Sequence, residues 1–377
     1  MSAATLLFLP YPSASGTWGS VVKLAAIAEV CRARGHRVVF HAGPPVDALL
    51  VRRGFPVVGC PVAAPGNGDR PIDSFYDACA ALGFDDELFW RDVLASEERA
   101  VATIRPDVLV SHLRLTAPLT AARHGLPLAS CASWCTDPRG QARDDDPLDD
   151  MARALAGYAG DPRPRSAVEL VSWHADAQLA SSDPVFEPEL ADAPRAQYTG
   201  YLRDPAPPRR GHHGPVPERL VLAYTSSAAW GTDRIIRVLA ESAARAGATL
   251  WCVTRAGGPT GRLGPQAELF GYLPFEQLIP AAGALVFHGG QGSALAALHH
   301  GTPALTIPGR HYERRYNSER LVALGAGVHG DLLDLRPSRL TEILSGLLDS
   351  PRPPPRPPDG GVRGAGSAAD AVLALAR

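Results

Sequence analysis

Residues 284–305 read Ala284-Leu-Val-Phe-His288-Gly-Gly-Gln-Gly-Ser293-Ala-Leu-Ala-Ala-Leu-His-His-Gly301-Thr-Pro-Ala-Leu305. The apolar run at the start predicts a strand that ends at His288, and the alanine-leucine run predicts a helix that begins near Ser293. The glycines between them, Gly289, Gly290 and Gly292, let the backbone turn closely. A strand, a tight turn and a helix in this order are typical of a parallel sheet covered by helices.

This turn is a candidate phosphate site. Unpaired amides and the positive end of a helix dipole attract anions. We expect His288 to add a hydrogen bond to a diphosphate oxygen, and Ser293 to cap the helix and contact phosphate. The glycines alone leave a purely steric explanation open. The P-loop and the dinucleotide fingerprint are excluded, because no lysine follows the glycines and the spacing is not Gly-x-Gly-x-x-Gly.

Strand-like and helical stretches alternate on both sides of this segment. In the first half the predicted strands are 5–9, 37–41, 107–111 and 126–130, and the predicted helices are 21–34 and about 117–124. In the second half the predicted strands are 220–224, 249–253 and 284–288, and the predicted helices are about 233–246 and 367–376. The second half therefore repeats the architecture of the first.

Proline and glycine crowd residues 203–217, which can hold neither a helix nor a central strand. We predict an N-terminal domain over 1–205, a linker over 206–217, a C-terminal domain over 218–355, and a proline-rich segment with a terminal helix over 356–377. The predicted fold class is α/β, with two Rossmann-like domains whose parallel sheets face a cleft and a last helix that crosses back to the first domain. Ligands of such sheets bind outside the carboxyl ends of the strands.

Composition narrows the function. The chain has 377 residues, with 37 basic and 39 acidic side chains and a net charge of −2. No field of one sign exists to attract nucleic acid or an anionic membrane. The apolar runs are shorter than the roughly 18 residues that a membrane span requires, and the N-terminus lacks a secretory signal, so we expect a cytoplasmic protein. The six cysteines are expected to be reduced, and Cys131 and Cys135 have no second pair to complete a metal site.

An ordered set of short motifs follows residue 271: Gly271-Tyr-Leu-Pro, Leu278-Ile-Pro, His288-Gly-Gly-Gln-Gly-Ser, Ala297-Leu, Gly301-Thr-Pro, Ile307-Pro, Asn317 and Gly325-Ala-Gly-Val. With these motifs, the segment from Gly271 to Gly330 closely resembles the donor-binding region of GT-B glycosyltransferases of the bacterial natural-product type. Weaker similarity covers residues 226–232 and 8–36. The resemblance implies that the second domain binds a nucleoside diphosphate sugar and the first domain binds a small-molecule acceptor.

The resemblance also implies a donor site. Its diphosphate contacts would be His288, the amides of Gly289, Gly290, Gly292 and Ser293, and Ser226 or Ser227 opposite, with Leu273 and its neighbours lining the base pocket. Ala296 stands where some relatives carry a ribose-binding glutamate, which favours a thymidine-type (dTDP) deoxysugar donor. The donor is a co-substrate, and neither a cofactor nor a metal is expected, because helix amides and His288 would stabilise the leaving charge.

Two departures from the family pattern concern the sugar and the catalytic base. Glu313 and Arg314 stand near the family's sugar-binding Asp-Gln pair, so the donor sugar is expected to be unusual unless both belong to a solvated charged loop. Ser20 stands where the family has its catalytic histidine, and a serine hydroxyl cannot accept a proton near neutral pH. His112, in place of the partner carboxylate, is one candidate base, from the opposite wall of the cleft, or else only caps its strand. Asp137 is a second candidate.

The predicted activity is that of an inverting, hexosyltransferase-type glycosyltransferase that acts on a natural-product acceptor. With the usual base lost, either His112 or Asp137 replaces it, or the acceptor is acidic, such as a phenol that reacts through oxygen or ring carbon. Trp18 and Trp134 are candidate acceptor contacts, or core residues. Residues 63–98 and 136–165 are expected to be loops that face the acceptor.

Two alternatives stay open at this stage. One is a catalytically degenerate homologue that binds a sugar nucleotide and assists a partner enzyme. The other is a sugar-nucleotide epimerase or hydrolase on the same fold. The sequence leaves the acceptor, the type of glycosidic bond and the oligomeric state open, a homodimer included.

Overall fold

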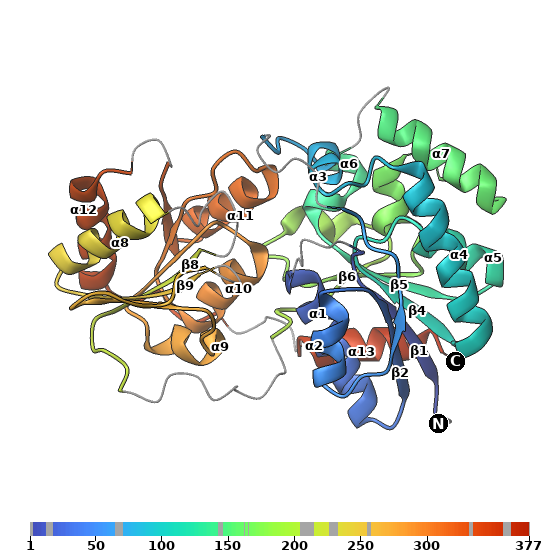
Figure 1. Ribbon diagram of the computed structural model, residues 1–377, viewed down its shortest axis with the longest axis horizontal. Helices are drawn as coiled ribbons and strands as arrows, with labels where there is room; N and C mark the ends of the chain where they lie inside the picture. Colours follow the sequence, from blue (N-terminus) through green and yellow to red (C-terminus); the bar gives the residue numbers. More distant parts are fainter. Residues whose placement is uncertain are drawn as a thin grey trace. The chain divides into compact units, whose positions relative to one another are not determined.

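The structure is a computed structural model that describes residues 3–12, 18–64, 71–141, 146–161, 163–164, 166–203, 215–225, 233–254, 258–331, 335–356 and 363–376. The chain folds into two units (Figure 1). Unit 1 contains residues 1–205 and 358–377, and unit 2 contains residues 206–357. The roles expected for them, acceptor binding and donor binding, stay predictions.

Unit 1 is built on a seven-stranded parallel sheet in the order β3-β2-β1-β4-β5-β6-β7. Its strands are β1 (Thr5–Leu9), β2 (Arg37–Ala42), β3 (Val57–Gly59), β4 (Val108–Ser111), β5 (Leu128–Ala132), β6 (Ala177–Ala180) and β7 (Ala196–Tyr198). Its α-helices are α1 (Trp18–Ala33), α2 (Val46–Arg52), α3 (Phe75–Ala81), α4 (Glu87–Ile104), α5 (Ala117–His124), α6 (Pro138–Gln141), α7 (Pro147–Ala159) and α13 (Ala365–Ala374). Short 3₁₀ or π turns are η1 (Trp134–Thr136), η2 (Glu169–Trp173) and η3 (Pro188–Asp192).

The alternation of side chains along β1 builds two cores, one on each face of this sheet. Leu6 and Phe8 pack in one apolar cluster with α1, α2 and α13. Leu7 and Leu9 pack in a second cluster with α4 and α5. Both faces of β1 are therefore buried, which explains why the strand is an unbroken apolar run.

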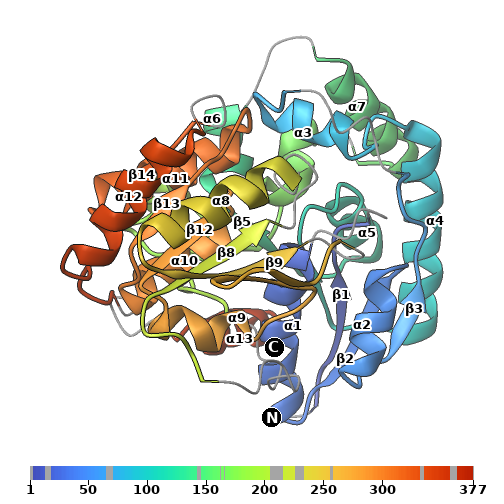
Figure 2. The same ribbon diagram turned by 60° about the vertical axis from the view of Figure 1, so that its left-hand side comes forward.

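The last helix returns to unit 1. Ala368, Ala369, Val372 and Leu373 of α13 are buried in the same cluster as α1. Figures 1 and 2 show α13 beside α1 at the face of the first sheet. The expected crossing of the terminal helix back to the first domain is confirmed.

Unit 2 has a second seven-stranded sheet, in the order β10-β11-β9-β8-β12-β13-β14, with only β10 antiparallel to its neighbour. Its strands are β8 (Leu220–Thr225), β9 (Thr249–Thr254), β10 (Gly261–Gly264), β11 (Ala267–Phe270), β12 (Ala284–Phe287), β13 (Ala304–Thr306) and β14 (Gly327–His329). Its helices are α8 (Asp233–Arg245), α9 (Phe275–Leu278), η4 (Ile279–Ala281), α10 (Gln291–His300), α11 (Tyr312–Ala323) and α12 (Pro337–Asp349). Helices α8 and α12 lie side by side on one apolar face (Figures 1 and 2).

The expectation of long loops over residues 63–98 and 136–165 is wrong in part. Helices α3 and α4 begin within the first range, and Ser74 and Asp86 cap them by accepting backbone N–H bonds. Helix α7 occupies most of the described residues in the second range. Residues 87–98 form a helix because apolar side chains such as Trp90 and Leu94 recur at helical spacing and are buried on one face of α4.

Candidate active site

The glycine turn joins β12 to α10 in unit 2. Gly289 has a φ of +86°, a left-handed conformation that favours glycine, and Gly290 is the N-cap of α10. The helix therefore begins at Gln291, two residues before the predicted start, and Ser293 is not its cap. The amides at this end have no partner within the helix, as at any α-helix start.

The turn is held by helix α11. Asn317, which is buried, donates from Nδ2 to the carbonyl oxygen of Gly289 at 2.9 Å. A Cβ atom on Gly289 would lie 2.6 Å from the carbonyl oxygen of Arg314. Close packing therefore requires glycine at this position, and Asn317 fixes the direction in which the peptide points.

Two imidazoles lie beside the turn with unsatisfied atoms. The Nδ1 atoms of His288 and His311 are buried and have no hydrogen-bond partner among the described residues. Burial, helped by the nearby charge of Arg314, lowers the pKa of each ring to about 3. Both rings are therefore neutral at pH 7. Burial also lowers the pKa of the Arg314 guanidinium. A buried polar atom without a partner requires an explanation, and a bound ligand is one.

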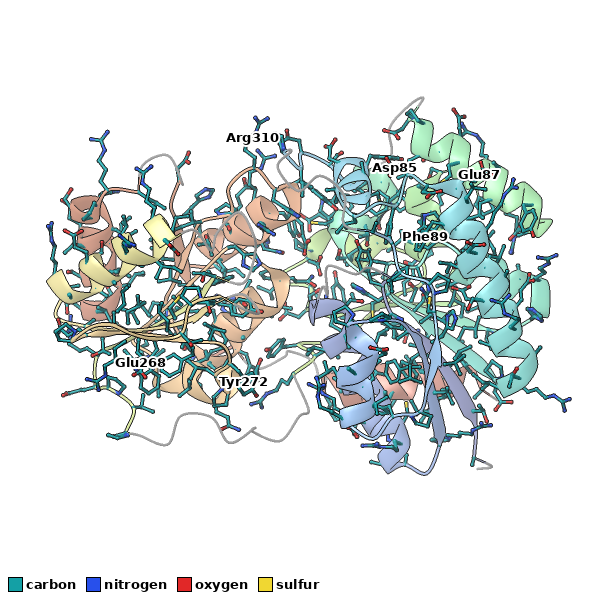
Figure 3. All side chains as sticks on the ribbon, in the orientation of Figure 1. Asp85, Glu87, Phe89, Glu268, Tyr272 and Arg310 are labelled. Atoms are coloured by element: carbon teal, nitrogen blue, oxygen red, sulfur yellow. The ribbon has the colours of Figure 1, made fainter. Side chains whose placement is uncertain are left out.

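The other residues expected at the donor site lie on the same unit. Glu313 and Arg314 form part of the first turn of α11 and are half-buried, whereas Arg310 is exposed and extends from the surface (Figure 3). Leu273 is buried, and Tyr272 beside it is exposed (Figure 3). Ser226 and Ser227 lie outside the described residues.

Ser20 and His112 are in direct contact in unit 1. Ser20 lies in the first turn of α1 and is 4% exposed, and His112 follows β4. The Nδ1 atom of His112 lies 2.8 Å from Oγ of Ser20, which also accepts the backbone N–H of Tyr11 at 3.4 Å. The expectation that His112 lies on an opposite wall from Ser20 is wrong, because β1 and β4 are neighbouring strands and bring the two side chains together.

The imidazole of His112 is uncharged at neutral pH. Burial lowers its pKa well below the ordinary value, and the nearby charge of Lys23 lowers it further. An imidazole without a proton on one nitrogen can accept one, so the pair has the composition of a base and a hydroxyl relay.

The carboxylate of Asp137 accepts three hydrogen bonds from Arg139, one of them from its backbone N–H. Arg139 donates to it from Nε and Nη2, each at 2.9 Å, and Asp137 is only 4% exposed. The Arg139 guanidinium also lies over the Trp134 ring, 5.6 Å from its centroid. This arrangement binds both carboxylate oxygens to the chain itself. The role of Asp137 as a base stays a prediction, as does acceptor binding by Trp134.

The remaining sequence predictions concern Trp18, the cysteines, a metal site and the cellular location. Trp18 begins α1, but its side chain lies outside the described residues. All six cysteines are buried as thiols. In the described ranges, no group of three or more His, Cys, Asp or Glu side chains is arranged to hold a metal ion, and no helix is both long and apolar enough to span a membrane. The cytoplasmic location stays a prediction.

Sequence reasoning missed two residues of these sites, His311 and Arg114, and it named Asn317 in a motif without its role. His311 and the role of Asn317 depend on how α11 packs against the turn, and His311 has no local sequence signal beyond its place after β13. Arg114, two residues after His112, is fully buried, and only its position at a strand end could have drawn attention to it.

Known proteins resemble both units. Residues 243–353 match the family described as "Erythromycin biosynthesis protein CIII-like, C-terminal domain". The elloramycin glycosyltransferase ElmGT of Streptomyces olivaceus is 28% identical over 339 residues, which cover 83% of each chain. Three further curated relatives match over only 19–20% of their own length.

Two solved structures share the fold over nearly the whole chain. The glycotransferase of kitacinnamycin has a TM-score of 0.78 at 20% identity and covers 100% of both chains. The glycosyltransferase VinC, solved in complex with dTDP, has a TM-score of 0.64 at 17% identity and covers 99% of this chain and 95% of its own. The two sequence matches make the chain a homologue of bacterial natural-product glycosyltransferases, and the solved structures show that it has the two-domain α/β GT-B fold.

Proposed function

We propose that the protein is an inverting glycosyltransferase that moves a hexose, such as a deoxysugar, from a nucleoside diphosphate to a small-molecule acceptor. The observation that carries this proposal is the buried Nδ1 atom of His288 beside the first turn of α10, for which the described part of the chain offers no hydrogen-bond partner. That atom and the backbone amides at the start of α10 are polar groups without charge of their own. A diphosphate would satisfy both.

The donor half of the reaction follows from these groups. The neutral imidazole of His288 donates one hydrogen bond to a diphosphate oxygen, and the helix amides donate others. Fixed donors stabilise the charge that grows on the diphosphate as its bond to the anomeric carbon breaks. Asn317 holds Gly289 in place, so the donors need not reorganise during the step.

The nucleotide is proposed to be thymidine diphosphate. The absence of a ribose-binding carboxylate at Ala296 supports it, because such a group would favour a ribose. The complex of VinC with dTDP is in line with this choice. A donor with a 2′-hydroxyl, such as a uridine nucleotide, is expected to bind more weakly.

The acceptor half uses the Ser20–His112 pair. With the imidazole hydrogen on Nε2, Ser20 donates its hydroxyl hydrogen to Nδ1 and has a lone pair left for the acceptor. The acceptor oxygen attacks the anomeric carbon, its proton moves to Oγ of Ser20, and the serine proton moves to His112. The electron pair of the broken bond leaves with the diphosphate. One displacement of this kind inverts the anomeric centre.

The degenerate sugar-nucleotide-binding homologue is the second candidate. The low pKa of His112 supports it, because an imidazole that resists protonation is a weak base. An acceptor that is itself acidic, such as a phenol, removes that difficulty, which is why we propose phenolic acceptors first.

Calorimetric titration with dTDP and UDP, followed by a diphosphate-release assay with dTDP-sugars and a phenol panel, tests the proposal. We expect dTDP to bind more tightly than UDP, and His288→Ala to weaken both. His329→Ala, which changes an exposed imidazole of the same unit, is the control. Binding without turnover across the panel would favour the degenerate homologue, release without acceptor would favour a hydrolase, and no binding would refute the donor site.

A further inference from the structure

A buried ion pair involves Arg114, two residues after His112 in the chain. Arg114 and Glu97 are both 0% exposed, and Nε of Arg114 lies 3.0 Å from Oε1 of Glu97. Taking two charges out of water is costly, and apolar residues of similar volume are often as stabilising. Stability alone therefore gives no reason for this pair, and its geometry is the feature to explain.

The two Nη atoms of Arg114 donate hydrogen bonds to residues at the ends of two strands, β2 and β3. Nη2 donates to Nδ1 of His41 at 2.9 Å and to its carbonyl oxygen at 3.0 Å, and Nη1 donates to Sγ of Cys60 at 3.2 Å. Since a guanidinium only donates, Nδ1 of His41 must accept, and its hydrogen lies on Nε2. Nε2 then donates to Oγ of Ser96 at 2.9 Å, and Ser96 donates to the carbonyl oxygen of Gly59 at 3.3 Å.

Glu97 ties the same cation to α5. Thr116 donates from Oγ1 to Oε1 of Glu97 at 2.6 Å, and Thr120 donates from Oγ1 to Oε2 at 2.5 Å. Both carboxylate oxygens are therefore satisfied. Arg114 is thus joined by charge or hydrogen bonds to β2, to the segment after β3, and through Glu97 to α4 and α5.

One residue separates this network from the His112 imidazole. Leu113 has a φ of +53°, and Arg105 is the only other non-glycine residue with a positive φ among those described. A side chain adopts this conformation only when its surroundings enforce it. Arg114 holds one end of the turn in the core, and the hydrogen bond to Ser20 engages the other end.

We propose that Arg114 is a positioning residue, which through its buried network with Glu97 and His41 fixes the backbone turn that holds the His112 imidazole against Ser20. The proposal rests on the function proposed above, because it gives His112 the role of base. Arg114 itself contacts neither donor nor acceptor in this scheme. The competing explanation is a core ion pair with no influence on His112.

Histidine-selective ¹⁵N NMR of the full chain tests the proposal without any need for turnover. The His112 signals are assigned with His112→Gln and followed in Arg114→Lys, Glu97→Gln and Thr120→Val. Glu98→Gln is the matched control, because Glu98 also lies on α4 and pairs with α5, through Arg123, but at the surface. Far-UV circular dichroism shows which variants are folded, and Thr120→Val, which loses only one hydroxyl, serves if the charge variants do not fold.

In the folded variants of Arg114, Glu97 and Thr120, we expect the ¹⁵N chemical shift of His112 Nδ1 to change to that of a nitrogen without a hydrogen bond to Ser20. We also expect the apparent pKa of His112 to rise toward about 6.5. Glu98→Gln should leave both unchanged. In turnover assays kcat should fall about 10²-fold with the KM for donor unchanged. A folded Arg114, Glu97 or Thr120 variant with wild-type His112 signals would overturn the proposal. A wild-type protein without turnover would overturn the proposed function instead, while the NMR result still decides the role of Arg114.

Discussion

The Nδ1 atom of His112 lies 2.8 Å from Oγ of Ser20, so the imidazole comes from a strand end and the hydroxyl from the start of a helix. In the family that the sequence resembles, the helix supplies the histidine and the strand end supplies its partner. The two positions remain in contact here while the chemistry at each has changed. An imidazole is thus retained at the same junction between β4 and α1.

The first prediction concerns this pair. His112→Ala should lower kcat about 10²- to 10⁴-fold, the range that general base catalysis contributes, and leave the affinity for donor unchanged. Ser20→Ala should have a similar effect if the hydroxyl relays the proton. Single-turnover rates with a phenolic acceptor measure both. His124→Ala, an exposed histidine on α5, is the control, and an unchanged rate in His112→Ala would exclude the imidazole as base.

The second prediction concerns the glycine turn. A Cβ atom on Gly290 would lie 3.0 Å from Nε2 of His288, so Gly290→Ala should displace the ring that we propose to contact the diphosphate. The affinity for dTDP should fall about tenfold, or about 1.4 kcal/mol, by calorimetry. Gly346→Ala in α12, where a Cβ atom meets nothing within 4 Å, is the matched control. Equal affinities in the two variants would contradict contact between His288 and the diphosphate.

The third prediction separates stability from catalysis at Asp137. Asp137→Asn removes the charge from a carboxylate that accepts two side-chain hydrogen bonds from Arg139. The unfolding free energy should fall by about 1.5–3 kcal/mol, as for other bonds to charged groups, while kcat changes little. Urea unfolding and turnover of the same preparation measure the two effects. A large loss of kcat with unchanged stability would instead make Asp137 the base.

The fourth prediction is a dependence of stability on pH that arises from His41. Burial first, and then the charge of Arg114, lowers the pKa of this imidazole to about 2 in the folded chain, whereas an unfolded histidine has a pKa of about 6.5. The unfolded state therefore takes up the proton first as the pH falls. His41 should leave stability unaffected above pH 6.5 and reduce it progressively below.

Between pH 7 and pH 5 this effect amounts to about 2 kcal/mol of unfolding free energy. The expected measurement is a smaller loss over that range in His41→Asn than in the wild type, by urea unfolding at both pH values. The double difference removes the contribution of the other buried histidines. Equal losses in the two proteins would show that His41 is not buried as a neutral ring.

Local sequence patterns predict most strands of the unit 1 sheet, but they do not predict the buried contacts of the helices that cover it. The strand Thr5–Leu9 and the helix Ala117–His124 have the predicted bounds, because apolar runs and a Gly125 stop are visible in the sequence. The prediction of a loop over residues 63–98 is wrong for the start of helix α4, although the apolar spacing of a helix is present there. The contact of Glu97 with Arg114 could not be predicted, since no local pattern tells which charges of a helix are buried.

The candidate site likewise has features that local sequence signals predict and contacts that only the fold determines. The glycine turn and His288 were predicted as a strand-to-helix connection, because a glycine cluster between two apolar runs is a local signal. The contact between Ser20 and His112 joins residues 92 positions apart and depends on the order of the strands. The support of the turn by Asn317 depends likewise on packing between two helices.

The return of α13 to unit 1 has a consequence for biosynthesis. During translation the residues of unit 2 leave the ribosome before α13, so α1 presents the apolar surface that faces α13 to solvent until all of unit 2 has been made. A chain that stops before residue 363 would keep that surface bare, with Arg34 lacking its ionic partner Asp370. Nascent or truncated forms should therefore depend on chaperones, however well unit 2 has folded.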